Sequence, residues 1–84
     1  MDVQLQRVIA EVLGIPAERV HAHLRREDVT EWDSLNHLRL ITAIESALGA
    51  AFTMEQIAAV STIGDLERAL GRPAEDGFSS GASR

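Results

Sequence analysis

The sequence predicts an all-α fold, a four-helix bundle with a long first loop and a short third helix. Three observations predict it. Apolar residues recur at helical spacing in separate segments, Asp, Ser or Thr precede several of these segments as helix caps, and apolar–polar alternation is never long enough for a strand. The 84 residues are too few for two hydrophobic cores, so we expect one folded domain.

The first helix is expected over residues 2–13. Its apolar residues fall three and four positions apart and form one stripe, Leu5, Val8, Ile9, Val12 and Leu13. Gly14 stands where a left-handed C-cap ends a helix, and Pro16 follows it. Residues 15–33 show no sustained period and are expected to form a loop with a short turn at 17–20. Five apolar side chains should pin this loop across the helices, namely Ile15, Val20, Leu24, Val29 and Trp32.

The second helix is expected over residues 34–48, with Asp33 as its N-cap and Gly49 ending it. A helical projection places five apolar residues on one broad face, Leu38, Leu40, Ile41, Ile44 and Leu48. Leu35 falls on the opposite side among polar residues. A large apolar residue that the fold does not bury is a candidate for a contact with a partner.

A short third helix is expected over residues 53–60, because Thr53 begins a capping-box pattern. Ser61 or Thr62 then caps a fourth helix that runs to Leu70. These elements define a domain of residues 1–70. Residues 71–84 hold three glycines, a proline and three serines but one large apolar residue, so we expect a flexible C-terminal tail.

The composition excludes several classes of function. The net charge of −5, from 13 acids and 8 bases, opposes unaided binding to nucleic acid or to an anionic membrane. The absence of cysteine removes disulfides, thiolate metal sites and a thiol nucleophile. No apolar run is long enough to span a bilayer, and the N-terminus does not resemble a signal peptide. We expect a cytoplasmic monomer.

Few residues suggest catalysis. His21 and His23 are the nearest approach to a metal motif, and two imidazoles in a loop are more simply surface residues. Ser34 and His37 stand three positions apart on one helix, so their side chains could approach as in a hydrolase. Nothing recognisable orients that histidine or builds an oxyanion hole. We therefore expect no catalytic residue and no metal site, and the protein is predicted not to be an enzyme.

The most informative segment is residues 31–35, at the start of the second helix. Asp33 caps the helix, and the hydroxyl of Ser34 projects where free backbone N–H groups and the helix dipole favour a phosphate. The apolar Leu35 follows on the solvent side. These features suit the attachment of a phosphodiester group, with the chemistry supplied by other proteins.

The sequence here resembles the acyl carrier and peptidyl carrier proteins over about residues 3–70. Four segments carry the resemblance in the family's order and spacing: Leu13-Gly14-Ile15 with a proline-containing acidic turn to Val20; Trp32-Asp33-Ser34-Leu35-Asn36-His37-Leu38; Ala43-Ile44-Glu45 with Leu48-Gly49 and Phe52; and Ser61-Thr62-Ile63-Gly64-Asp65-Leu66. The second of these matches the family's modification motif.

The resemblance implies a cofactor and its position. Ser34 would be the attachment point of 4′-phosphopantetheine, which a phosphopantetheinyl transferase moves from coenzyme A with magnesium. Asp33 matches the family's aspartate, which helps to position that metal in the transferase complex. The thiol of the arm would hold acyl or aminoacyl groups as thioesters, and a long arm lets them reach successive active sites. The carrier itself would supply no catalytic group.

The resemblance also implies partners that dock on the second helix, a loading enzyme and downstream synthases or tailoring enzymes. The residues expected to contact them are Leu35, Leu38, Arg39, Thr42 and Ile57. The dense acidic face of fatty-acid carriers is missing, because Glu45 is the one acid of this helix beside Arg39 and His37. Trp32 also replaces a small residue. These departures favour a dedicated carrier in polyketide, nonribosomal peptide or related specialised biosynthesis, and the absence of flanking domain sequence leads us to expect a freestanding one.

Two other functions remain open on the sequence alone. An unmodified helical protein-interaction module would have the same core and would use Asp33 and Ser34 only as a cap. A helix-turn-helix DNA-binding protein is opposed by the acidic charge and by the lack of a basic recognition helix.

Overall fold

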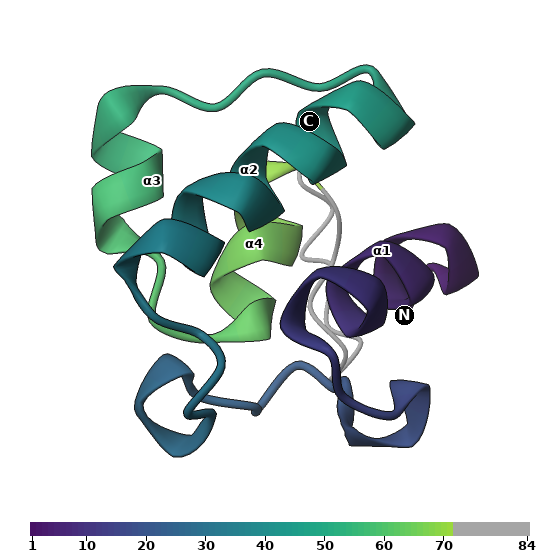
Figure 1. Ribbon diagram of the computed structural model, residues 1–84. Coiled ribbons are helices and arrows are strands. Elements are labelled where there is room, and N and C mark those ends of the chain that lie inside the picture. Colours follow the sequence, from purple (N-terminus) through teal and green to yellow (C-terminus); the bar gives the residue numbers. More distant parts are fainter. Residues whose placement is uncertain (72–84) are drawn as a thin grey trace.

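The computed structural model describes residues 1–71 and gives four α-helices in that part of the chain. Their bounds are Val3–Leu13 for α1, Ser34–Leu48 for α2, Met54–Ala59 for α3 and Ile63–Ala69 for α4. In Figure 1, α2 crosses the middle of the domain, with α1 beside it, α4 behind it and the short α3 at one side. No strand occurs in the described part, which confirms the all-α prediction. The flexible tail predicted from residue 71 lies, except for Gly71, outside the described residues.

The core lies where α1, α2 and α4 face one another. Its largest fully buried side chains come from these three helices, and they are Leu5, Ile9, Leu13, Leu40, Ile44, Ile63 and Leu66. Each such side chain stabilises the fold by about 1.5–3 kcal/mol relative to exposure. The stripe predicted on α1 therefore faces the core. Asp2 begins that helix by accepting the backbone N–H of Gln4 at 2.7 Å, and Gly14 ends it at φ 67°.

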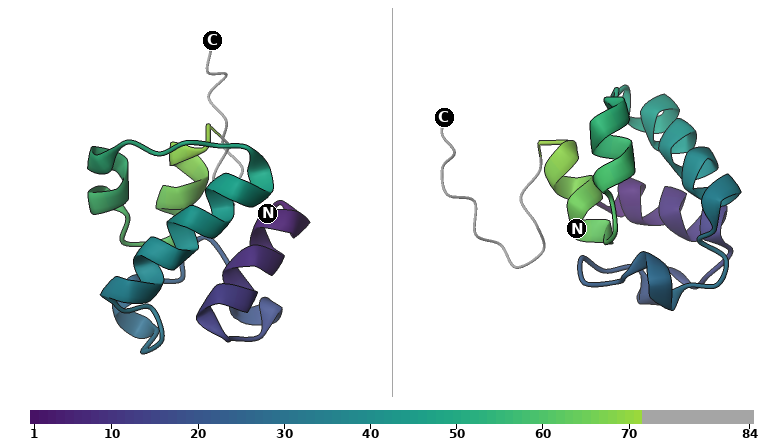
Figure 2. Two further views of the ribbon diagram at one scale, coloured as in Figure 1. Left: turned by 45° about the horizontal axis from the view of Figure 1, so that its top comes forward. Right: turned by 90° about the vertical axis from the view of Figure 1, so that its left-hand side faces the viewer.

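The long loop of residues 14–33 is ordered by packing and by backbone hydrogen bonds. All five predicted anchors are buried, and the expected turn is a 3₁₀ turn at Ala17–Arg19; a second one spans Arg26–Asp28. The loop runs along one end of the helices (Figure 2). Its carbonyls at Ala22 and Leu24 accept the first N–H groups of α4, from Gly64 at 2.9 Å and Ile63 at 3.0 Å. The loop is thereby joined to the start of α4.

One prediction about α2 is wrong. Leu38 was placed on the apolar face, but its side chain is 57% exposed. The buried residues of α2 are His37, Leu40, Ile41 and Ile44. Leu40, Ile41 and Ile44 are buried as predicted, but in the first turns of α2 the core position is taken by His37 in place of Leu38. Leu38 then shares the solvent stripe with Leu35, three positions before it.

Candidate functional site

Ser34 is the first residue of α2, and its side chain is exposed. Asp33 precedes it as the N-cap, and its carboxylate accepts the backbone N–H of Asn36 at 2.9 Å. The Asp33 carbonyl accepts the N–H of His37 at 2.8 Å. Within residues 1–71 the Ser34 hydroxyl has no hydrogen-bond partner. The cap is therefore complete without the serine, whose hydroxyl is left for another use.

The backbone around Ser34 is also open. The N–H groups of Ser34 and Leu35 have no acceptor in the described part of the chain, while the next two N–H groups of α2 are bonded to Asp33. Free N–H groups and the dipole at a helix start favour an anionic substituent such as a phosphodiester. An oxygen on Ser34 that carries a phosphate would lie beside these donors.

Trp32 and His37 form a buried hydrogen-bonded chain beneath the helix start. The indole Nε1–H of Trp32 donates to Nδ1 of His37 at 3.0 Å. Because an indole N–H can only donate, Nδ1 must be the acceptor and Nε2 carries the imidazole proton. That proton is donated to the carbonyl of Ile57 at 2.9 Å. The side chain of Trp32 is 2% exposed and that of His37 6%.

These hydrogen bonds exclude one arrangement of His37 that the sequence left open. Both ring nitrogens are engaged, and the ring lies in the core, so the suggested approach of His37 to the Ser34 hydroxyl does not occur. No local pattern predicted this role of His37, although Trp32 and His37 stand five positions apart on either side of the cap.

Four of the five predicted partner residues form one surface on α2. Leu35 is 60% exposed and Leu38 57%, and with Arg39 and Thr42 they line a shallow hollow along the helix. We call Leu35, Leu38, Arg39 and Thr42 the α2 face. Ile57 is not part of it, because it is half-buried and packs against the core.

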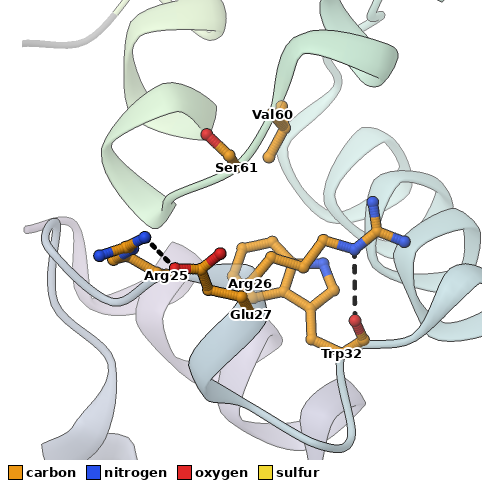
Figure 3. Close-up of a pocket in the computed structure, with 6 residues that line it drawn as sticks. All are labelled: Arg25, Arg26, Glu27, Trp32, Val60 and Ser61. Atoms are coloured by element: carbon orange, nitrogen blue, oxygen red, sulfur yellow. Dashed lines mark hydrogen bonds and ion pairs between the residues drawn. The ribbon is translucent and has the colours of Figure 1, made fainter.

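Other parts of the described chain carry less chemistry. His21 and His23 are exposed, with ring centroids 6.4 Å apart, and residues 1–71 contain no group of three or more His, Cys, Asp or Glu side chains placed to hold a metal ion. A second hollow lies beside Trp32, between the Arg26–Asp28 turn and the link from α3 to α4 (Figure 3). No helix among the described residues has the length and apolar character needed to cross a membrane.

The site thus defines a class of protein, a small helical domain that offers an unengaged hydroxyl at an open helix start beside an exposed apolar face. Comparison with known families agrees with this class. Residues 3–70 match the family described as "Phosphopantetheine attachment site". The chain belongs to this family, whose members are non-catalytic carriers with covalently attached 4′-phosphopantetheine. The predicted family and cofactor are confirmed.

Two curated relatives are similar over most of the chain. The acyl carrier protein of Saccharopolyspora erythraea is 31% identical over 61 residues, which are 73% of this chain and 64% of that protein. Acyl carrier protein 3 of Ralstonia nicotianae is 33% identical over 63 residues, 75% of this chain and 72% of that protein. The match thus covers just under two thirds of the first relative's length.

Proposed function

We propose that residues 1–70 form a carrier domain in which Ser34 holds 4′-phosphopantetheine and presents acyl or aminoacyl groups to partner enzymes. The observation that carries the proposal is the exposed Ser34 hydroxyl, which no described residue engages, at a helix start with two unbonded N–H groups. The attached group supplies a terminal thiol that holds the cargo as a thioester.

We propose two separate roles for Asp33. Its carboxylate caps α2 through the N–H of Asn36, and this contact uses one oxygen at an exposed position. The second oxygen remains available to a magnesium ion that a transferase brings with coenzyme A, since carboxylate oxygens are ligands that this ion prefers. The cytoplasm, where coenzyme A is available, is the proposed location.

The α2 face supports a proposal about the partners. Its centre is apolar and its charge comes from Arg39, because the one acid of α2, Glu45, is half-buried and accepts the N–H of Phe52 at 2.9 Å. A partner that matches this face has an apolar recess for Leu35 and Leu38 and a carboxylate opposite Arg39. A basic patch, which suits an acidic carrier, would be repelled by Arg39. This favours dedicated enzymes of polyketide, nonribosomal peptide or related specialised biosynthesis.

The attachment is tested by incubation with a broad-specificity phosphopantetheinyl transferase, coenzyme A and magnesium, followed by intact mass measurement. The wild type should gain one phosphopantetheinyl group, and Ser34→Ala should gain none. Ser61→Ala is the matched control, because Ser61 is also exposed and next to a helix start, and it should be modified normally. The chain has no cysteine, so a maleimide label counts the new thiol directly. An unchanged wild-type mass would favour the unmodified interaction module.

The docking proposal is tested with the same transferase. Leu35→Ala should raise the KM for the carrier several-fold, since buried apolar anchors dominate such contacts. Val3→Ala is the matched control, because Val3 is a similarly exposed apolar residue on α1, at 64%. Equal KM values for the two variants would remove Leu35 from the docking surface.

A further inference from the structure

The segment Glu31–Asp33, which we call the cap segment, is held in place more firmly than a helix cap requires. The side-chain amide of Asn36 donates to the carbonyl of Glu31 at 2.7 Å. Nε of Arg26 donates to the carbonyl of Trp32 at 3.2 Å. The N-cap bond from the Asn36 N–H to Asp33 requires neither of these contacts, so they hold the cap segment in addition to the cap.

The contacts come from three directions. Asn36 folds back onto the cap segment from the first turn of α2, and Arg26 reaches it from the second 3₁₀ turn of the loop. Figure 3 shows the half-buried Arg26 side chain extended across to the Trp32 carbonyl, with the indole beneath it. On the core side of the cap segment, the indole of Trp32 is hydrogen-bonded to His37. The other ring nitrogen of His37 is bonded to the carbonyl of Ile57 in α3.

Ser34 lies between these contacts and takes part in none of them. The cap segment precedes it, Asn36 and His37 follow it, and their side chains bond back across it or beneath it. The backbone on both sides of the serine is thereby fixed while its hydroxyl stays unengaged. A cap that served only folding stability would have no reason to leave the one hydroxyl at its centre out of the network.

We propose that Asn36, Arg26 and His37 are positioning residues for the modification of Ser34 and act by holding the cap segment rigid. The inference rests on the proposed attachment at Ser34. In the transferase the Ser34 oxygen forms a bond to the phosphorus of coenzyme A that carries pantetheine, the pyrophosphate bond breaks with release of adenosine 3′,5′-bisphosphate, and the hydroxyl proton passes to a base of the transferase. This in-line geometry requires a fixed hydroxyl, and a mobile segment would have to be ordered during that encounter. The three side chains order it beforehand. The α2 face is untouched by them, so docking and positioning are separable.

Asn36→Ala is the sharpest test. Alanine favours the helix more than asparagine, so the substitution removes the bond to Glu31 without weakening α2. We expect the kcat of the transferase to fall roughly 3- to 10-fold, the range that corresponds to losing one net hydrogen bond, with the KM for the carrier unchanged. The melting temperature should change little. Arg26→Met, which keeps the apolar stem, should have a similar effect on kcat.

The matched control for Asn36→Ala is Gln4→Ala. Nε2 of Gln4 donates to the carbonyl of Ala47 at 3.1 Å, so this variant loses the same kind of bond at the opposite end of α2. Its kcat should equal that of the wild type. Arg25→Met is the control for Arg26→Met, because Arg25 is a neighbouring arginine whose side chain pairs with Glu27 and does not reach the cap segment.

His37 is tested by two variants that each keep one of its bonds. His37→Gln places a donor near the Nε2 position and loses the indole bond, whereas His37→Asn places an acceptor near Nδ1 and loses the bond to Ile57. Trp32 is the single tryptophan, so its indole N–H gives one NMR signal that reports the bond directly. That signal should move in His37→Gln and stay near its position in His37→Asn, and kcat should fall more in His37→Gln.

The outcomes separate the two proposals. If the wild type is not modified at all, the proposed function fails. If the wild type is modified at Ser34 while Asn36→Ala and Arg26→Met keep wild-type kcat values, the positioning role is wrong and the proposed function stands. A rise in KM with unchanged kcat would also overturn the inference, because it would make the cap segment a docking contact.

Discussion

The starts of α2 and α4 are both preceded by exposed polar residues, yet the protein uses them differently. At α4 the hydroxyl of Ser61 donates to the Asp65 carboxylate at 3.1 Å, and the first two helix N–H groups are bonded to loop carbonyls. At α2 the hydroxyl of Ser34 and the first two N–H groups have no partner among residues 1–71. Two exposed serines near helix starts thus differ in whether folding has already used their hydroxyl. Exposure alone would not distinguish them.

The difference lies in the third residue of each helix. Asp65 closes a capping box with Thr62 and also accepts from the N–H of Ser61 at 2.9 Å. Asn36 occupies the same position in α2, but its amide turns back to Glu31. A carboxylate in the third position draws the preceding polar groups to itself, whereas the amide leaves them open. The start of α4 is thus stabilised by hydrogen bonds to Asp65, whereas the start of α2 leaves the Ser34 hydroxyl accessible to a partner.

The largest expected effect on stability is at the start of α4, where Asp65 engages the neighbouring polar groups. Asp65→Ala removes the acceptor for two backbone N–H groups, the Ser61 hydroxyl and Arg68, whose guanidinium lies 2.6 Å away. We expect a loss of about 2 kcal/mol in the free energy of unfolding. Chemical denaturation followed by the fluorescence of Trp32 measures it. Modification of Ser34 should proceed normally in conditions where the variant is folded, and impaired modification would show that the two helix starts are coupled.

The folding stability should depend on pH through the same carboxylate, that of Asp65. Partial burial by itself raises the pKa of Asp65, but hydrogen bonds from the Ser61 backbone, Arg68, the Thr62 backbone and the Ser61 hydroxyl outweigh it and lower the pKa from 3.8 to about 2. A lowered folded-state pKa gives stability that is complete above pH 3.8 and is lost as the pH falls toward 2.

After allowance for solvent screening, this contribution is about 1–2 kcal/mol. The melting temperatures of the wild type and Asp65→Ala should therefore converge as the pH falls from 3.8 toward 2, as circular dichroism would record. A constant difference across that range would mean that the charge of Asp65 does not stabilise α4.

At the start of α2, the capping role of Asp33 can be separated from the role of its negative charge. Asp33→Asn keeps an N-cap side chain of similar strength, so the free energy of unfolding should change by less than about 0.5 kcal/mol, whereas Asp33→Ala should lose about 1 kcal/mol. Both variants should be modified more slowly than the wild type, because both lack the carboxylate proposed to contact magnesium. Unfolding curves and initial rates of modification measure the two effects. Wild-type rates in Asp33→Asn would restrict Asp33 to a capping role.

The smallest effect distinguishes the two serines directly. Ser34→Ala should leave the free energy of unfolding within about 0.5 kcal/mol of the wild type, because no bond is lost. Ser61→Ala should lower it by about 0.5–1 kcal/mol through the lost bond to Asp65. Paired denaturation curves decide the order. A larger loss in Ser34→Ala would show that its hydroxyl is structural, and the comparison of the two helix starts would fail.

The sequence by itself determined the helices, their caps and the anchors of the long loop. The stripe of α1, the capping box at Thr53 and the glycines after α1 and α2 are local signals, and local signals depend on residues close together in the chain. The modification motif around Ser34 can also be predicted from the sequence, since four segments at fixed spacing resemble one family. The position and exposure of Ser34 follow from its place after the N-cap.

Tertiary structure decided what the local pattern could not. His37 takes a core position because a buried indole and a carbonyl of α3 satisfy its two nitrogens, and these partners lie 5 and 20 residues away. With His37 in the core at this end of α2, Leu38 lies on the exposed side. The bond from Arg26 to the cap segment likewise depends on the path of the loop. A polar side chain can be buried wherever distant partners complete its hydrogen bonds, and only the folded chain brings those partners together.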